Sequence, residues 1–220
     1  MMFLQEVTHA NIDMISQYTA HMNIGTEGRG TAILAKDGLI LPKIQRIPSG
    51  RGIAATLNGI RVVNIYAPSG SEKRREREAF YNGEVVTLIP PTVTEMILAR
   101  DFNCVLSKAD CTGQINHTKA FERLVGGLEL RDAWDATPKR IVFTHYTTKG
   151  ASRIDRMYIT ENLRRTQQGA EAVAAAFADH MAIMLRLSID IPCVMRGKGY
   201  WRMNVSYLSD PHFQHRLQEK

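Results

Sequence analysis

The chain has 220 residues, 44% of them hydrophobic, which is enough to fill the core of one large domain. No apolar run approaches the roughly 18 residues that a membrane-spanning helix needs, and the first residues lack the features of a signal peptide, so we expect no membrane partner. The chain contains an odd number of cysteines without paired spacing, namely Cys104, Cys111 and Cys193. Neither a disulfide framework nor a zinc site is therefore expected, and reduced thiols fit the cytosol or the nucleus.

The charge balance is basic, with a formal net charge of +6 and a pI near 9.3. Such a charge attracts polyanions and speeds encounters with them. It does not choose among polyanions, and an ordinary basic surface is an equally good interpretation of the charge alone.

The order of the predicted elements indicates a mixed α/β fold in one domain. Short runs rich in β-branched residues predict strands at residues 31–35, 53–57, 61–66, 95–99, 141–146, 153–159, 170–175 and 182–189. Asn58-Gly59 lies between the second and third runs and predicts a β-hairpin, because both residues tolerate positive φ. A hairpin implies antiparallel pairing, so a purely parallel sheet is disfavoured.

Apolar residues at helical spacing predict helices between these strands. One helix follows from Ile12, Ile15, Tyr18 and Met22, and another from Phe121, Leu124, Val125 and Leu128, ending near Gly126-Gly127. A charged helix is predicted after Ser71, with Phe80 and Val85 on its buried face. Its lysines and arginines alternate with glutamates, which favours a solvated face over a contact with a phosphate backbone. A last short helix is predicted after Ser209-Asp210-Pro211.

Polar residues at the ends of the apolar strands are the candidates for chemistry, because a buried carboxylate is costly unless a cation, a partner or a substrate compensates its charge. They are Glu6, Asn64, Tyr66, Asp101, Asn103, Asp155, Asp179 and His180. Each one alone also fits a structural role, such as a helix cap or a satisfied hydrogen-bonded pair. Together they predict one cleft that gathers acids, an amide, a phenol and an imidazole.

Such a cleft suits the hydrolysis of a phosphate ester. Carboxylates and an amide without a cysteine ligand favour Mg²⁺ or Mn²⁺ over zinc. An aspartate beside a histidine can orient its ring and stabilise the imidazolium. Because no serine or cysteine nucleophile motif accompanies them, an activated water is the expected attacking group.

Five motifs in this order, "LQE", "NIYAPSG", "RDFN", "SRIDRMYI" and "ADH", resemble the endonuclease/exonuclease/phosphatase superfamily. "GRGTAIL", "SRIDR" and "GYWRMNVSYLSDPHF" are similar to the endonuclease domain of LINE-type (non-LTR) retrotransposon polyproteins. The resemblance implies a four-layer α/β sandwich like deoxyribonuclease I, with two mixed β-sheets flanked by helices, over residues 1–196. It implies further that the N-terminal strand of the family is absent, and that residues 197–220 are a tail leading toward a reverse transcriptase.

The same resemblance assigns roles to the polar residues. Glu6 is expected to be the principal ligand of Mg²⁺ (or Mn²⁺), with Asp179 near the metal or at a second metal position. Asp101 would activate the attacking water and Asn103 would hold it. The expected contacts with the phosphate come from Tyr66 and His180, with Asp155 orienting His180. Contacts with DNA are expected from Asn64 and from the segment with His145, Lys149 and Arg153 that forms a hairpin toward the minor groove.

Two residues depart from the family pattern. Arg100 occupies the position of a glycine before Asp101, and Ala178 replaces a serine before the Asp-His pair. Three functions therefore stay open: an endonuclease that nicks DNA to leave a 3′-hydroxyl primer, a DNA-binding remnant that no longer cuts, and a phosphatase of small phosphate esters. For the first, we expect a monomer acting on chromosomal DNA in the nucleus, with a reverse transcriptase covalently linked in the full-length relatives.

Overall fold

The computed structural model describes residues 1–8, 17–113, 115–136, 142–148, 150–174 and 178–190. Its largest sheet has six strands in the order β4-β5-β6-β7-β11-β8. Their bounds are Gln45–Arg46, Gly52–Leu57, Ile60–Tyr66, Met96–Asp101, Asp155–Ile159 and Arg131–Asp132. Strands β6 and β7 are parallel and every other pair in this sheet is antiparallel, which confirms the predicted mixed sheet.

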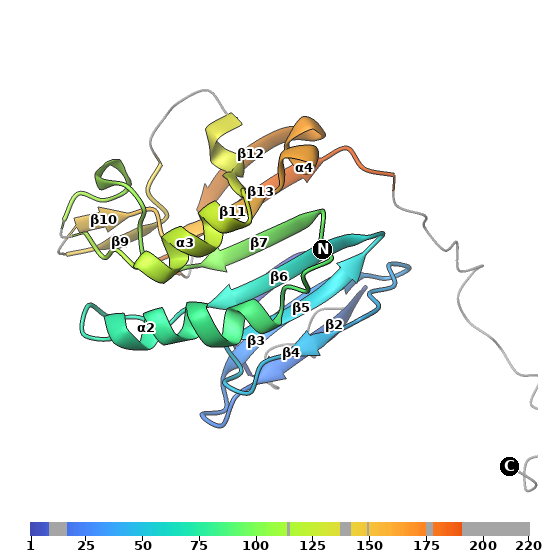
Figure 1. Cartoon of the computed structure of the whole chain (residues 1–220), viewed down its shortest axis with the longest axis horizontal. Helices are drawn as coiled ribbons and strands as arrows, with labels where there is room; N and C mark the ends of the chain where they lie inside the picture. Colours follow the sequence, from blue (N-terminus) through green and yellow to red (C-terminus); the bar gives the residue numbers. More distant parts are fainter. Residues whose placement is uncertain (9–16, 114, 137–141, 149, 175–177, 191–220) are drawn as a thin grey trace, which may run out of the picture.

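Two smaller sheets pack against one face of the six-stranded sheet. One has the order β1-β3-β2, with bounds Met2–Val7, Gly30–Lys36 and Tyr18–Ile24, and the other pairs β12 (Gln167–Ala174) with β13 (Met181–Leu187). Phe3 and Ile33 from the first, and Ile183 and Leu185 from the second, share one apolar cluster with the six-stranded sheet. A short hairpin of β9 (His145–Thr147) and β10 (Gly150–Ser152) extends from one end (Figure 1).

Helices cover the opposite face of the six-stranded sheet (Figure 1). Helix α2 (Arg74–Phe80), the π-helical turn η1 (Tyr81–Val85) and helix α3 (Lys119–Gly127) bury Phe80, Val85 and Phe121 in a second apolar cluster. Short helix α4 (Glu161–Arg165) buries Leu163 between the sheets, and the 3₁₀ turns η2 (Lys108–Asp110) and η3 (Ala133–Ala136) lie in loops. The predicted α/β sandwich is therefore confirmed. None of the helices in the described ranges is long and apolar enough to span a membrane.

The hairpin predicted at Asn58-Gly59 is confirmed. The two residues have φ values of 48° and 84°, and Leu57 pairs with Ile60 across the turn. Positive φ at both central residues matches the right-handed twist of the strands they join.

One helix prediction is wrong. Residues Tyr18–Ile24, predicted as part of a helix, form β2 and pair with β3 residue by residue from Tyr18↔Lys36 to Ile24↔Gly30. Strand β3 is almost fully buried, so the backbone groups along its second edge need a partner, and that need overrides helical spacing. Ile12 and Ile15 lie outside the described residues.

The other predicted elements shift at their ends. Helix α2 starts after Lys73 and not at Ser71, and the strand predicted at 141–146 begins only at His145. The helix predicted from Phe121 is confirmed as α3. The turn at Ser209-Asp210-Pro211 and the tail 197–220 lie outside the described residues.

A cavity of about 730 Å³ separates the two small sheets. Met1 to Leu4 line one side of it and Ala182 to Leu185 line the other. Successive side chains of a strand point to opposite faces, so a cavity lined by consecutive residues runs along a strand edge. In the described part of the chain no strand pairs with these two edges, and the layer facing the six-stranded sheet is therefore split in two.

Candidate active site

The predicted site residues meet at one edge of the six-stranded sheet, where parallel β6 and β7 end and antiparallel β11 begins, on the left in Figure 1. Strand register places Tyr66 beside Asp101, and Asp101 beside Asp155. The ends of parallel strands lie at the same edge of a sheet, so residues far apart in the sequence become neighbours here.

Asp101 is held by the turn that follows it. The backbone N–H of Asn103 donates to Oδ1 of Asp101 at 2.9 Å, and the Asn103 amide donates to Oδ2 at 3.0 Å and to the Ala67 carbonyl at 2.8 Å. Asn103 adopts φ 47°, a conformation that asparagine tolerates better than most residues. Phe102 points the other way into the core and packs on the rings of Phe121 and Tyr158. The turn therefore aims a carboxylate and a carboxamide at the same space.

Asp155 and His180 form a hydrogen-bonded pair. Nδ1 of His180 lies 2.7 Å from Oδ2 of Asp155, and Asp155 is itself buried, with its backbone N–H donating to the Thr144 hydroxyl at 3.0 Å. Ligand atoms of Asp101, Asp155 and His180 all lie within 4.8 Å of one another. The structure thus brings together an acid, an orienting carboxylate and an imidazole, as the sequence predicted.

The electrostatics of this group favour proton transfer near neutral pH. Burial, followed by repulsion from Asp155, raises the pKa of Asp101 to about 7. Burial by itself would lower the pKa of His180, but the hydrogen bond to Asp155 and the attraction of Asp155 and Asp101 raise it above its usual value. A carboxylate with a pKa near 7 is well matched to act as a general base.

The donor set fits a hard divalent cation. Asp101 and Asp155 are 5% and 4% exposed and repel each other, so a bound cation would relieve the repulsion. Carboxylate and amide oxygens are the ligands that Mg²⁺ and Mn²⁺ prefer. Glu6 belongs to neither of the two groups of potential ligands found in the described part of the chain.

Glu6 nevertheless lies at the same edge, beside Tyr66. It occupies a bulge where the pairing of β1 with β3 slips between Gln5 and Val7, and its φ is 52°. A bulge re-aims a side chain, and here the Tyr66 hydroxyl donates to Oε1 of Glu6 at 2.5 Å. Arg29 lies 3.6 Å from the other carboxylate oxygen. Burial, followed by the bond to Glu6, raises the pKa of Tyr66 to about 12, so its phenol stays a donor.

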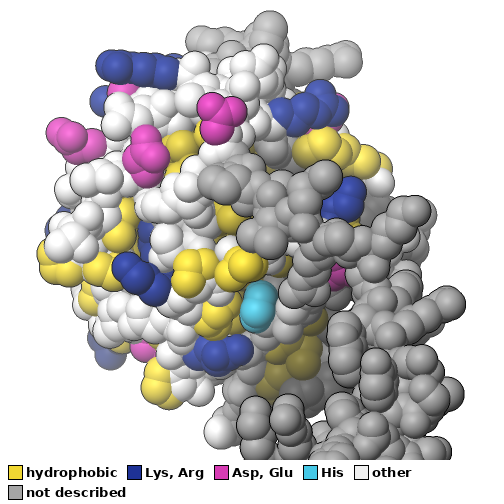
Figure 2. Space-filling view, turned by 90° about the vertical axis from the view of Figure 1, so that its right-hand side faces the viewer, with side chains coloured by type: hydrophobic (Ala, Val, Ile, Leu, Met, Phe, Trp, Pro, Cys, Tyr) yellow, Lys and Arg dark blue, Asp and Glu magenta, His cyan; other side chains and the backbone are white. Residues whose placement is uncertain are grey.

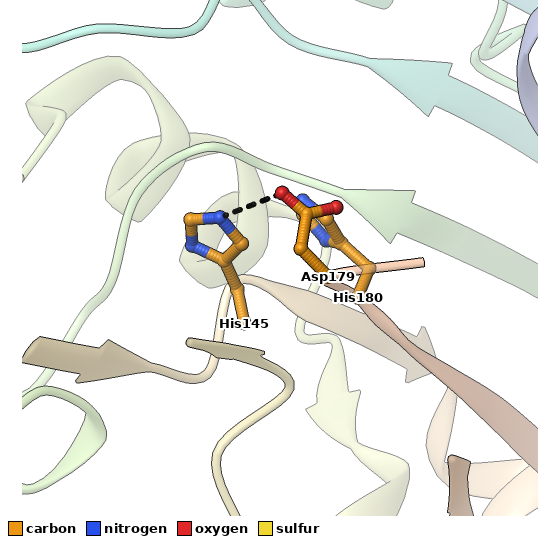
Figure 3. Close-up of side chains that lie close together, drawn as sticks. All are labelled: His145, Asp179 and His180. Atoms are coloured by element: carbon orange, nitrogen blue, oxygen red, sulfur yellow. Dashed lines mark ion pairs between the residues drawn. The ribbon is translucent and has the colours of Figure 1, made fainter. Parts of the chain in front are cut away.

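A second group of potential ligands adjoins the first and shares His180. Nε2 of His145 lies 3.7 Å from the Asp179 carboxylate, and the rings of His145 and His180 stack with centroids 4.4 Å apart (Figure 3). Burial, followed by repulsion from His180, lowers the pKa of His145. Asp179, predicted near a metal, is 73% exposed in its side chain and faces the two imidazoles.

Two predicted DNA contacts are corrected by the structure. Asn64 is fully buried: its amide donates to the carbonyls of Leu4 and Ala32, and it accepts from Gln5, so it ties the sheets together. Arg153 is only 12% exposed and forms ion pairs with Asp110 and Asp132, which removes it from the surface. A buried, satisfied side chain cannot reach DNA. Lys149 lies outside the described residues.

The backbone conformation of Arg100 is a feature that sequence reasoning did not predict. Its φ is 144°, in a region that residues other than glycine rarely adopt, so a glycine would fit this position without strain. The Arg100 side chain has room at this position and donates from Nε to the Phe3 carbonyl at 2.9 Å. Sequence reasoning also missed Thr144, which positions Asp155 and accepts from the backbone of Met181.

The positive charge is scattered on the face of the molecule that Figure 2 shows. Figure 2 shows the end of the molecule opposite the site, where lysine and arginine side chains lie apart from one another with acidic and apolar side chains between them. On this face the net charge of +6 does not form one continuous basic patch.

Comparison with known proteins links the chain to transposons and to nucleases. No protein-family model matches it. It is 29% identical over 163 residues to the transposon TX1 uncharacterized 149 kDa protein of Xenopus laevis, an alignment that covers 69% of this chain. The chain spans only 12% of the length of that relative.

Solved structures share its fold. A 3′ phosphatase from Neisseria, bound to product DNA hairpin, and a 3′-5′ exonuclease from Neisseria meningitidis each give a TM-score of 0.72 at 18% identity, covering 85% of this chain and 88% of theirs. An AP endonuclease from Archaeoglobus fulgidus gives 0.70 with the same coverage and identity. The chain thus has the fold of the endonuclease/exonuclease/phosphatase superfamily, as its motifs indicated.

Proposed function

We propose that the chain is the endonuclease region of a transposon-encoded protein, hydrolysing a phosphodiester in one strand of DNA. The observation that carries this proposal is the convergence of Asp101, Asp155 and His180 at one sheet edge. The nuclease fold and the similarity to the TX1 protein support it. Cutting would leave a 3′-hydroxyl that primes a linked reverse transcriptase, and the site of action would be chromosomal DNA in the nucleus.

Asp101 would activate the attacking water. With a pKa near 7 it can accept a proton from water at neutral pH. The two amide hydrogens of Asn103 are donated to Asp101 and Ala67, which leaves its Oδ1 to accept a hydrogen bond from the same water molecule. Two hydrogen bonds from Asn103 hold the Asp101 carboxylate in one orientation. The carboxylate that would activate the attacking water is therefore oriented before DNA binds.

His180 would contact the scissile phosphate. Asp155 occupies its Nδ1, which leaves Nε2 to donate to a phosphate oxygen and stabilises the protonated ring. The Tyr66 phenol, at the same edge, donates to Glu6 in this structure and would become a second donor for the phosphate once Glu6 turned to the cation. Donors fixed in advance stabilise the negative charge that develops in the transition state.

A divalent cation, Mg²⁺ or Mn²⁺, would be held by Glu6, the ligand that the resemblance implies, which leaves Asp101 free to act as the base. When bound, it supplies charge stabilisation for the phosphate and the leaving 3′ oxygen. Asp155 is not needed as a ligand, because its hydrogen bond to His180 matches the orienting role that the sequence predicts for it.

Closed circular plasmid is the decisive substrate, because it has no ends for an exonuclease or a 3′ phosphatase, whereas an endonuclease converts it to the nicked form. We expect the full chain to convert supercoiled plasmid to the nicked form with Mg²⁺ and to stop when the metal is chelated. Nicking that persists with chelator would refute the metal requirement. No nicking together with DNA binding in a gel-shift assay would favour the remnant that binds without cutting.

Processing of 3′ ends is the second candidate, because one structural neighbour, the Neisseria enzyme NExo, is described as a 3′ phosphatase in one structure and as a 3′-5′ exonuclease in another. A duplex oligonucleotide with a 3′ phosphate separates the candidates. Phosphate release from the oligonucleotide without plasmid nicking would favour end processing. Release from inositol phosphates alone would favour a phosphatase of small esters.

A further inference from the structure

We propose that His145, Asp179 and His180 form a second metal site, for a transition-metal cation such as Zn²⁺, beside the hard-cation site. His145 opens β9, and Asp179 and His180 precede β13, so the ligands come from two strands (Figure 3). Their ligand atoms lie within 4.8 Å of one another. Of the three side chains, only the two imidazoles are partly buried, which leaves the site open to solvent on the Asp179 side.

The ligand set selects the metal. Two imidazole nitrogens and one carboxylate suit zinc and its transition-metal neighbours, whereas Mg²⁺ prefers oxygen ligands only. Three protein ligands leave a fourth position for water or another group, as in zinc sites that are not purely structural. Ligand atoms around a tetrahedral zinc lie about 3.3 Å apart. The 3.7 Å between Nε2 of His145 and the Asp179 carboxylate is close to that separation and too long for a hydrogen bond.

The backbone holds the two imidazoles in place. His145 and His180 face each other across an isolated β-bridge, and the Met181 N–H donates to the Thr144 carbonyl at 2.7 Å. The His180 side chain is fixed too, because Asp155 accepts a hydrogen bond from its Nδ1 at 2.7 Å. A carboxylate bonded to one imidazole nitrogen directs the other nitrogen toward a metal, and such partners strengthen metal sites.

Occupation of this site would affect DNA cleavage. His180 is shared with the site described above, and its Nε2 cannot bind zinc and a phosphate oxygen at the same time. On the proposed function, Zn²⁺ would therefore inhibit nicking in the presence of Mg²⁺. This consequence rests on the proposed function, whereas metal binding at the three side chains does not.

Titration with Co²⁺, a coloured probe for zinc sites, tests the binding directly on the full chain. We expect one Co²⁺ per chain with visible absorption, displaced by Zn²⁺ and unaffected by excess Mg²⁺. His145→Phe keeps a ring against His180 but removes a ligand, so the affinity should fall at least about tenfold, and His145→Gln should do the same. Circular dichroism checks that both variants fold.

A control variant tests whether the two histidines near the C-terminus bind the metal instead. The double variant His212→Ala/His215→Ala removes the closely spaced pair near the C-terminus and should keep the absorption of the unchanged chain. Failure of the unchanged chain to bind Co²⁺, or equal affinity in the folded His145 variants, would overturn the proposal. Loss of the signal only in the double variant would place the metal in the tail and would overturn it as well.

Inhibition of nicking by Zn²⁺ is measured to distinguish failure of the metal site from failure of the proposed nuclease function. Each variant is compared with itself, with and without Zn²⁺ at constant Mg²⁺. We expect inhibition of the unchanged chain and a tenfold or greater loss of zinc sensitivity in His145→Phe. A chain that binds Co²⁺ through His145 but never nicks DNA would keep the metal site and refute the nuclease. Nicking with equal zinc sensitivity in both chains would refute inhibition through this site.

Discussion

Two clusters of buried charge lie in the same sandwich and differ in their balance. The first is a network of two arginines and two aspartates at the end of the six-stranded sheet, formed by Arg153, Arg156, Asp110 and Asp132. A guanidinium nitrogen of Arg153 lies 2.9 Å from a carboxylate oxygen of Asp110, and one of Arg156 lies 2.7 Å from a carboxylate oxygen of Asp132. Burial by itself would lower the pKa of Arg156, but Tyr158, Asp132 and Asp110 raise it above its usual value.

The second cluster is the candidate site, where the charges do not cancel. Asp101 and Asp155 face one histidine, and the pKa of Asp101 rises to about 7. In the network each charge has an opposite partner, and the ion pairs hold the loops together. At the site two buried carboxylates share one imidazole, so a proton, a cation or a substrate must balance the remaining negative charge. Incomplete compensation of buried charge therefore separates the reactive cluster from the structural one.

The largest effect is expected from breaking the reactive cluster. His180→Ala and Asp155→Ala should each lower the rate of plasmid nicking on the order of a thousandfold, because proton transfer and phosphate contact are lost. The unfolding midpoint of both variants should stay close to that of the unchanged chain. His117→Ala is the matched control, since His117 pairs with Glu122 outside the site. Unchanged nicking in both site variants would point to a contaminating nuclease.

Breaking the balanced network should cost stability. Asp132→Ala leaves the guanidinium groups of Arg153 and Arg156 with too little negative charge, and we expect the free energy of unfolding to fall by about 3–5 kcal/mol. Urea denaturation measures the change. Glu161→Ala, which removes an exposed pair with Arg131, should cost less than about 1 kcal/mol. Similar losses in both variants would contradict the proposed difference between the clusters.

Stability without metal should depend on pH through Asp101. The pKa of its carboxyl is about 7 in the folded chain and about 3.9 in the unfolded chain, so ionisation opposes folding. Stability is fully present below pH 4 and is lost as the pH rises to about 7. Relative to Asp101→Asn, the unchanged chain should lose on the order of 4 kcal/mol over this window, measured by urea denaturation with chelator present. The exposed Asp37→Asn should follow the unchanged chain, and an identical pH dependence in Asp101→Asn would refute the assignment.

The smallest effect concerns the strained residue beside the site. At ordinary strand positions glycine is less stable than alanine by about 0.5–1 kcal/mol. At Arg100, with φ 144°, the order should reverse, and Arg100→Gly should exceed Arg100→Ala in stability by about 1 kcal/mol. Both variants lose the hydrogen bond to Phe3, so the difference isolates backbone strain. Thermal unfolding of the pair decides it, and a more stable alanine variant would show that the position is not strained.

Local patterns in the sequence predicted much of the fold. The Asn58-Gly59 hairpin, the apolar face of α3 and most strands of the six-stranded sheet follow from turn chemistry and periodicity, which act over a few residues. The helix predicted through Tyr18 failed, because the free edge of β3 is a long-range demand that no local window contains. The two misplaced DNA contacts failed for the same reason, since burial of Asn64 and Arg153 depends on strands that are distant in the sequence.

The sequence by itself determined which groups are available for chemistry: acids, an amide, a phenol and an imidazole at strand ends, in an order that resembles one superfamily. Only the tertiary structure decided which of them share a space. It placed Asp101, Asp155 and His180 together, gave His145 a place beside them and left Glu6 with Tyr66. Charge interactions fall off within a few ångströms and depend on burial, so the reactivity of these groups is set by distances that exist only in the folded chain.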